Sequence, residues 1–388
     1  MRSSSVWLWP ECVGTRPLLS QSRPAASVFA LLLALASGAV LLLIAGHEPL
    51  AAYSALLNGA AGSDSRLGET LMNAVPLILT GLAVGVAFRA GLFNIGAEGQ
   101  LLMGAVVTAG LAPTLALPWF LTLPLLIVVG GLAGALWAFV PGLLKARLGA
   151  NEVISSLMMS YIAFYVTEYL VVNPLKAEGV LPATELVPEA NRLPRMGDVL
   201  SGVGQSLGLS AEEIPGDFLG RLHLGLPIAL LVALGTSYLL WRTVPGFAIR
   251  ILGLNPEAAT YGGVRVGRAI ILTMMLSGAI AGLAGAIQVL GVNYRMSSTF
   301  SPGFGFTGIA VALLGNITPV GIVLAAVLFA VLQTGGQVMQ RSAEIPVAIV
   351  TIVQALVIFF VAVQLRLPRS YLYVWGARLR ARAARWRS

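Results

Sequence analysis

Apolar residues occur in long continuous runs separated by shorter polar segments, with little of the alternation that marks half-buried strands. The first run, residues 27–46, would span about 30 Å as a helix, the thickness of a hydrocarbon core. It is longer than the apolar region of a secretory signal, and it ends in His47, Glu48 and Pro49 rather than a small-residue cleavage site. We therefore expect a retained membrane helix.

The remaining runs extend this pattern along the chain and predict an all-α polytopic membrane protein of about ten transmembrane helices. The expected helices are 27–46, 70–90, 95–116, 118–144, 152–172, 222–242, 268–290, 303–316, 319–339 and 344–365. The run at 303–316 is too short to span fully and indicates a half-helix that stops inside the protein. Helices 2–5 and 7–10 form two blocks that start on opposite sides of the membrane, which predicts an inverted repeat.

The polar segments divide the chain around a transmembrane domain at residues 27–365. Lysine and arginine are more frequent in the segments that lie inside if the N-terminus is inside, so we expect both termini in the cytoplasm. The expected segments are a cytoplasmic N-terminal stretch at 1–26, an outer loop at 173–221, a cytoplasmic loop at 243–267 and a basic tail at 366–388. The outer loop is either a plain connection or a docking surface for a partner outside the membrane.

Composition supports the membrane assignment and narrows the partners. Only 10% of the residues are charged and the mean hydropathy is +0.87, whereas about 25% of the residues in a soluble domain are charged. The net charge is +8, and seven arginines without an acid lie between Arg366 and Arg387. Because this basic stretch adjoins an apolar run, it indicates contact with the inner membrane surface and not with nucleic acid.

Several kinds of chemistry are excluded by the residues present. The single cysteine, Cys12, allows neither an intrachain disulfide nor a cysteine metal site, and His47 and His223 lack metal-ligand spacing. Lys145 and Lys176 are both followed by alanine and lack the glycines of a phosphate-binding loop. We therefore expect no enzyme activity, metal or cofactor in this chain, and the energy for transport would come from a partner or an ion gradient.

The loop at 243–267 contains the signals of a short helix. Asn255 is a good N-cap, Pro256 suits the first helical position, and Glu257 is favoured in the first turn by the helix dipole. Ala258 and Ala259 continue the helix. One interpretation is an interfacial helix lying on the membrane, and the other is a coupling helix that fits a groove on a cytoplasmic motor subunit.

Two further stretches interrupt helices in apolar surroundings. Asn94 can cap the helix that carries Glu98 and Gln100, and an acid there is expensive unless it faces a cavity or a partner. Gly315 and Asn316 break a second helix, which membranes tolerate only inside protein or beside a water-filled cavity. These residues either brace tight bends or line a translocation path. Aromatic residues near these stretches, Phe93, Phe304 and Phe306, would stack on a solute base or simply pack.

Four motifs occur in order along the chain: F-N-I-G-A-E-G-Q at 93–100, N-E-V-I-S-S-L-M at 151–158, G-L-N-P-E-A-A at 253–259 and G-I-A-V-A-L-L-G at 308–315. Together they resemble the ABC importer permeases of the branched-chain amino acid, monosaccharide and nucleoside group. The closest likeness is to the nucleoside or simple-sugar branch, and it covers roughly residues 27–365.

The resemblance implies a type II importer fold in a bacterial inner membrane. It also implies two cytoplasmic ABC ATPases that bind ATP and Mg, a second permease subunit that is a paralogue or a second copy, and an extracytoplasmic solute-binding protein. The implied coupling residues are Gly253, Leu254, Asn255, Pro256, Glu257, Ala258 and Ala259. The implied path residues are Phe93, Asn94, Glu98, Gln100, Gly315 and Asn316.

Two other functions remain open at this point. One is a branched-chain amino acid ABC permease. The other is a secondary transporter that works alone, which the scarcity of ionisable residues within the apolar runs disfavours.

Overall fold

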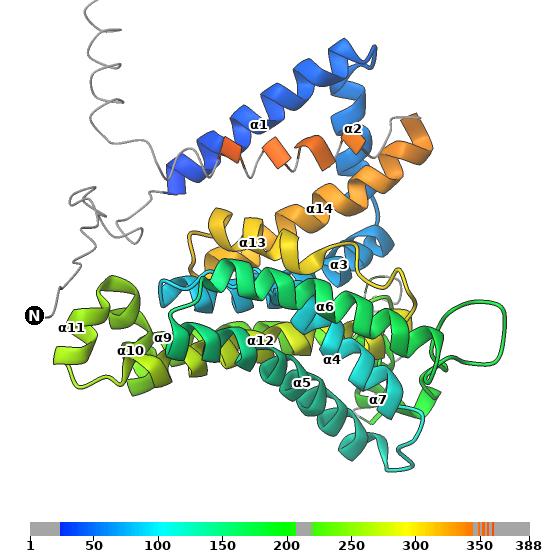
Figure 1. The fold of residues 1–388 in the computed structure, drawn as a ribbon. Helices are drawn as coiled ribbons and strands as arrows, with labels where there is room; N and C mark the ends of the chain where they lie inside the picture. The colour runs from blue at the N-terminus through cyan, green and yellow to red at the C-terminus, as the bar shows by residue number, and fades with distance from the viewer. Residues whose placement is uncertain are drawn as a thin grey trace, which may run out of the picture.

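The computed structural model describes residues 24–206, 218, 220–343, 348–349, 351–353, 355–356 and 359–360. These residues form helices joined by loops, with isolated β-bridges only (Figure 1). The helices are α1 Pro24–Ile44, α2 Pro49–Ala61, α3 Asp64–Arg89, α4 Ala97–Leu111, α5 Trp119–Leu148, α6 Glu152–Val172, η1 Glu189–Asn191, α7 Met196–Ser206, α9 Gly225–Arg242, α10 Val244–Leu254, α11 Pro256–Tyr261, α12 Val266–Gln288, the π-helical turn η3 Val289–Asn293, α13 Phe304–Leu314 and α14 Pro319–Ala343.

The polytopic all-α class is confirmed, but ten full crossings are not. Six helices of the described chain are long and apolar enough to cross a membrane, and a seventh crossing is possible if α1 and α2, bent by 120°, count as one. The helices α4 and α13 are shorter, at 15 and 11 residues. Most of the expected helix 344–365 lies outside the described residues, as do residues 1–23 and the tail 366–388.

The helices α2 and α10 were not among those expected from the sequence. The segment of α2 is too rich in small and polar residues to stand out as an apolar run, but it packs closely on α14, where a Cβ added at Gly59 would lie 2.6 Å from Val338. The segment of α10 was expected as part of the loop at 243–267, and it contains a proline and a glycine near its start. Instead the proline occupies the first turn, and the Thr243 hydroxyl accepts a hydrogen bond from the Gly246 N–H at 3.2 Å.

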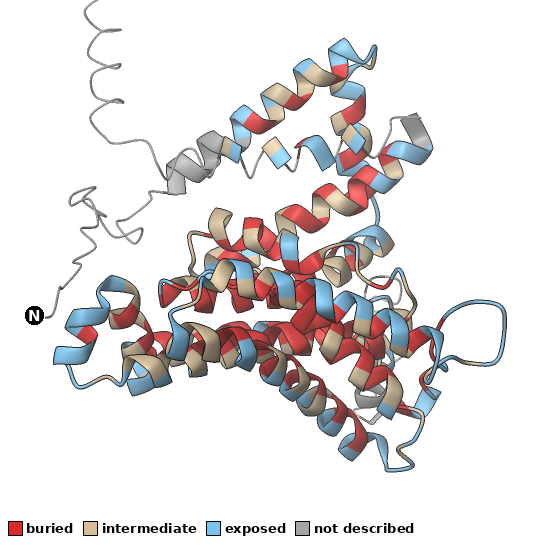
Figure 2. Ribbon diagram, in the orientation of Figure 1, coloured by how far each residue is buried: buried red, intermediate tan, exposed pale blue. Residues whose placement is uncertain are grey.

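The centre of the bundle depends on close contact between helix backbones. A Cβ at Gly282 in α12 would collide with the carbonyl oxygen of Gly130 in α5, and one at Gly104 in α4 would collide with that of Gly282. Small residues permit this approach in lipid, where van der Waals contact supplies much of the association between helices. In the most apolar stretch of each helix, 83% of the α3 residues are buried but only 22% of the α6 residues. The helix α3 is therefore central in the bundle and α6 is peripheral (Figure 2).

The segment after α6 covers one end of the bundle, while α10 and α11 project from the other (Figure 1). This segment was expected as a loop at 173–221, and its described part also contains η1 and α7. It is attached by the side-chain amide of Asn191, which donates to the carbonyls of Ala112 at 2.8 Å and Leu115 at 3.2 Å. These bonds satisfy the carbonyl of Ala112, the C-cap of α4, and a carbonyl of the loop that follows it.

The glycine packing gives a first prediction. Gly282→Val should lower the stability of the purified protein by about 3 kcal/mol or more, because backbone atoms of α5 cannot move aside as a flexible side chain would. The melting temperature in detergent measures this effect. Gly235→Val on α9 is the matched control, since nothing lies within 4 Å of the added Cβ there. Equal melting temperatures for the two variants would contradict the packing argument.

A second prediction concerns pH. His223, in the segment before α9, is 2% exposed, and its Nδ1 accepts a hydrogen bond from the Gly225 N–H at 2.9 Å. Burial lowers the pKa of His223 from 6.5 to about 4, because the charged ring would lose its hydration. The unfolded chain therefore takes up a proton at a higher pH than the folded one. The stabilisation is fully present above pH 6.5 and is lost as the pH falls through about 4.

The melting temperature of the purified protein should thus fall between pH 7 and pH 4, with a slope in stability of at most about 1.4 kcal/mol per pH unit from this group. His223→Gln should flatten that slope, because an amide can still accept from Gly225 and does not titrate. His47→Gln should leave it unchanged. A slope that survives in His223→Gln would assign the pH dependence to other groups.

Candidate functional site

The first turn of α4 carries a buried carboxylate that holds another helix. Glu98 is 7% exposed, and its Oε2 accepts a hydrogen bond from the backbone N–H of Gly305 at 2.6 Å. The hydroxyl of Ser301 and the N–H of Phe306 also bond to this carboxylate. Glu98 therefore satisfies the free donors at the N-terminus of α13, where a negative charge is favoured by the helix dipole.

The helix α13 begins inside the bundle, whereas the short run at 303–316 was expected to stop inside it. The carbonyl of Phe304 accepts a hydrogen bond from the Thr80 hydroxyl at 3.1 Å, and Thr80 lies well within α3. A Cβ at Gly305 would collide with the backbone of Glu98. The short helix α13 therefore runs from the level of Thr80, within α3, to the end of α3, and it does not cross the whole bundle.

The helix α6 presents a polar and aromatic stripe to the same region. The Asn151 side chain caps α6 by accepting from the Val153 N–H at 2.9 Å, and the Lys145–Glu152 ion pair at 2.8 Å fixes its turn from α5. The stripe follows helical spacing and comprises Ser160, Tyr161, Phe164, Tyr165 and Glu168. The rings of Tyr161 and Tyr165 are 55% and 67% exposed, so this face is not covered by the chain itself.

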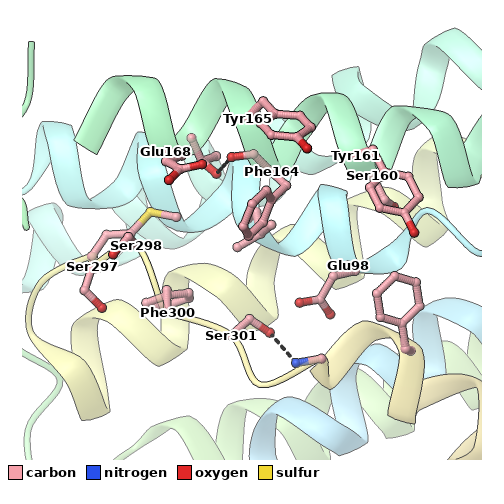
Figure 3. A pocket seen from close by; sticks show the side chains of 15 residues that line it. Glu98, Ser160, Tyr161, Phe164, Tyr165, Glu168, Ser297, Ser298, Phe300 and Ser301 are labelled. Carbon is pink, nitrogen blue, oxygen red and sulfur yellow. Dashed lines mark hydrogen bonds between the residues drawn. The ribbon is translucent and has the colours of Figure 1, made fainter. Parts of the chain in front are cut away.

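A cavity of about 300 Å³ lies between this stripe and the segment that precedes α13 (Figure 3). Glu98 and the α6 stripe form one side of it, and the residues at 296–306 form the other. Its lining from that segment includes Met296, Ser297, Ser298, Phe300, Ser301 and Phe306. Aromatic faces can stack on a planar ring, while hydroxyls and a carboxylate can bind ligand hydroxyls, so the cavity suits a polar solute with a flat, apolar part.

Among the six expected path residues, Glu98 lines this cavity and the other five lie elsewhere. Asn94 and Gln100 are 0% and 1% exposed and bond to each other twice, at 2.9 and 3.0 Å. Asn94 also donates to the Ser277 hydroxyl at 2.8 Å, so this pair joins α4 to α12. Phe93 packs on Phe88 with ring centroids 4.9 Å apart.

Gly315 and Asn316 lie at the opposite end of α13 from Glu98, where the chain turns into α14. The structure therefore brings Glu98 together with residues that the sequence did not single out. Those residues are the tyrosines of α6 and the serines at 297–301. Only one feature of the sequence could have pointed to them. In α6, polar and aromatic side chains recur every three or four residues within an otherwise apolar run.

The expected coupling residues form a short, projecting helix. Asn255 caps α11, because its side-chain oxygen accepts from the N–H groups of Glu257 at 2.8 Å and Ala258 at 3.2 Å. Glu257 is exposed, whereas Ala259 is fully buried against the neighbouring structure. The pair α10 and α11 projects from the bundle (Figure 1). Apolar side chains on it are exposed at Phe247, Leu254 and Tyr261.

The fold and the cavity together define a class of protein. Long apolar helices surround a helix that starts within the bundle, and a cavity lined by aromatic and polar side chains lies beside that start. This is the arrangement of a membrane transport protein. Within the described residues, no three histidine, cysteine, aspartate or glutamate side chains gather as metal ligands would.

Comparison with known proteins agrees with this class. Residues 66–362 match the family described as the permease component of the branched-chain amino acid transport system. The guanosine ABC transporter permease NupP of Bacillus subtilis is 40% identical over 86% of this chain and 92% of its own length. The glucose ABC transporter permease TsgB13 of Haloferax volcanii is 37% identical over 86% and 85%. The nucleoside ABC transporter permease NupB of Lactococcus lactis is 37% identical over 84% and 87%.

The chain therefore belongs to the family of ABC permease components, as the four sequence motifs indicated. It is a membrane-embedded subunit of an ABC transport system and not the subunit that hydrolyses ATP. No solved structure matches it.

The role of Glu98 gives a third prediction. Glu98→Ala should lower the melting temperature of the purified protein by an amount equivalent to about 2 kcal/mol, because it leaves the buried N–H groups of α13 without an acceptor. Glu98→Gln should have a smaller effect, since its carbonyl oxygen can still accept. The control is Glu168→Ala, an exposed acid of the same cavity, which should be neutral. The interpretation fails if both alanine variants are equally stable.

Proposed function

We propose that this chain imports nucleosides as one of two permease subunits driven by separate ABC ATPases. The observation that carries the proposal is the cavity beside Glu98, which combines exposed tyrosine rings with serine hydroxyls and carboxylates. The names of NupP and NupB, which refer to guanosine and nucleosides, support the same solute class.

A nucleoside suits this lining better than a sugar or an aliphatic amino acid. Stacking of a base on an aromatic ring contributes about 1–3 kcal/mol and tolerates different bases. Tyr161, Tyr165 and Phe306 present partly exposed rings for this purpose. The ribose hydroxyls would bond to Ser297, Ser298 and the exposed carboxylate of Glu168, while Glu98 remains engaged with α13.

The cavity lacks a wall on the side where the α6 rings are exposed, and a second permease would supply that wall. Bacillus subtilis has a more distant relative of this chain, NupQ, at 26% identity, which is also named as a guanosine ABC transporter permease. A paralogue of that kind is therefore the proposed partner, so that the solute passes between two similar but non-identical subunits.

The coupling function is assigned to Gly253, Leu254, Asn255, Pro256, Glu257, Ala258 and Ala259. The projection of α11 and the exposure of Glu257 and Tyr261 favour insertion into a groove of the ATPase over a helix lying flat on the membrane. The ATPase would bind ATP and Mg, and its movement would rock the two permeases between outward-open and inward-open states.

The orientation follows from this assignment. The projecting end with α11 would face the cytoplasm of a bacterial cell, as would residues 1–26 and 366–388, with residues 27–365 as the transmembrane domain. The segment after α6 would then face outward and receive the solute-binding protein. Exposed apolar side chains at Val180, Leu181 and Leu186 favour a docking role for it over a plain connection.

The fourth prediction tests this function. The tagged chain is purified from native membranes with the proteins that accompany it, and the complex is reconstituted into liposomes with ATP and the binding protein. Uptake of radiolabelled guanosine should exceed uptake of glucose or leucine at least tenfold. Tyr165→Leu should reduce guanosine uptake several-fold, because it removes a stacking face. Tyr238→Leu is the matched control, since Tyr238 is 66% exposed on α9 and does not line the cavity.

Preferred uptake of glucose or leucine would keep the permease assignment and reject the nucleoside. Uptake that does not depend on ATP and stops when an ion gradient is collapsed would indicate a secondary transporter and overturn the coupling proposal. Equal activity of the two tyrosine variants would remove the cavity from the solute path.

A further inference from the structure

A stack of three side chains joins α3, α9 and α10 at the end of the bundle from which α11 projects. The guanidinium carbon of Arg89 lies 5.4 Å from the centroid of the Trp241 ring, and that of Arg250 lies 4.7 Å from it. Arginine over a tryptophan face is a favourable cation–π contact. Because the three residues come from three helices, the stack ties the segment that carries the coupling helix to the central helix α3.

Backbone contact reinforces this connection. A Cβ at Gly253, the residue two positions before Asn255, would collide with the carbonyl oxygen of Arg89. A Cβ at Gly91 would in turn lie 3.4 Å from the Cα of Gly253. The end of α10 thus rests directly on the end of α3, and a displacement of α11 must act on the backbone around Arg89.

Arg89 also holds the break between α13 and α14. Its Nε donates a hydrogen bond to the carbonyl of Ile317 at 2.9 Å. Asn316 and Ile317 have φ angles of 54° and 52°, in the left-handed region. A β-branched residue such as isoleucine is seldom found there, because its Cβ comes too close to the following carbonyl oxygen. The conformation of the break therefore depends on the contacts that surround it.

The helix α13 links this break to the cavity. Its 11 residues form a rod of about 16 Å. Arg89 contacts the break that follows the last residue of α13, and Glu98 binds N–H groups in the first turn of α13. A shift of the break along the helix axis would consequently move Phe306 and the Glu98 carboxylate, both of which line the cavity.

We propose that Arg89 is the positioning residue through which movement of the coupling segment α10–α11 reaches α13 and the cavity. The inference rests on the proposed function, because it requires an ATPase that moves α11. When that segment shifts, Arg89 loses its position between Trp241 and Ile317, and the strained break relaxes to a second conformation. Coupling between distant sites requires such an element with two states, and spatial continuity alone does not establish it.

Arginine is needed at this position for its shape as well as its charge. Its planar guanidinium stacks on the indole while the Nε–H points along the side chain to the Ile317 carbonyl. Lysine offers a point charge on a flexible stem and cannot make both contacts in this geometry. Arg89→Lys therefore tests the geometry while it preserves the charge.

The fifth prediction uses a reporter in the cavity that does not require the solute. Cys12, the only cysteine, is replaced by serine, and Ser298→Cys introduces a single thiol that lines the cavity. The complex with its ATPases is reconstituted, and the reaction rate of the thiol with a membrane-impermeant thiosulfonate is measured. The rate without nucleotide is compared with the rate in ATP and vanadate. A nucleotide-dependent change in the parent chain supports the proposed function, and its absence rejects that function together with this inference.

In that reporter chain, Arg89→Lys and Arg89→Met should reduce the nucleotide-dependent rate change at least fivefold, while ATP hydrolysis by the assembled complex is retained. Arg242→Met, which removes an exposed arginine one residue beyond Trp241, should leave the change intact. A change of full size in Arg89→Lys would overturn the proposal. A loss of ATP hydrolysis in proportion to the loss of the rate change would also overturn the proposal, because that result indicates a general structural defect.

If the Arg89 variants fail to assemble, Trp241→Leu decides the question. The Trp241 ring is 48% exposed, so its replacement should spare the fold while it removes the stack. It should reduce the rate change, and a full-size change would overturn the proposal. Where the double variant assembles, adding Arg89→Lys should cause no further loss, because residues in one chain of contacts are not additive. Additive losses would also reject the proposed route.

Discussion

A helix that starts in the middle of a membrane bundle needs an acceptor for its first N–H groups. Water supplies that acceptor at a protein surface, but not within an apolar bundle. Glu98 supplies it here, and its charge is compensated by the N-terminus of α13 and by the Ser301 hydroxyl. The short α13, the turn before α14 and the cavity all depend on this one carboxylate, because without it the half-helix has no stable beginning.

The rest of the bundle accommodates this irregularity through dense packing of small residues. The glycines of α4, α5 and α12 bring three backbones into contact. The neighbouring helix α3 is buried along most of its length. The buried amides Asn94 and Gln100 serve the same purpose, since they connect α4 to α12 through Ser277. A rigid centre with an open, aromatic flank is the result.

The sequence predicts those parts of the structure that follow from local chemistry. The bounds of α6, the cap at Asn255 and the half-helix near 303–316 follow from apolar length, capping residues and helix breakers. Tertiary packing decides the parts that were missed. The small-residue helix α2 is stabilised by α14, and the polar pair Asn94 and Gln100, which suggested a path, is turned into the core.

The candidate site is less predictable than the fold for a related reason. Glu98 stands out in sequence because a charge in an apolar run demands an explanation. Tyr165 and Ser298 do not, since neither side chain carries a charge. Only the approach of α6 to the segment before α13 gives them a common role, and that approach joins residues more than a hundred positions apart.

The incomplete wall of the cavity has a consequence for how such a subunit is made by a cell. A hollow on the flank of a helix bundle is not a passage, because half of any continuous channel is missing. Where a second permease completes the wall, as proposed, a newly inserted chain without that partner would leave the bilayer sealed to small solutes. The permeability of the membrane would then arise only at assembly, so excess copies of one subunit would not dissipate the cell's concentration gradients.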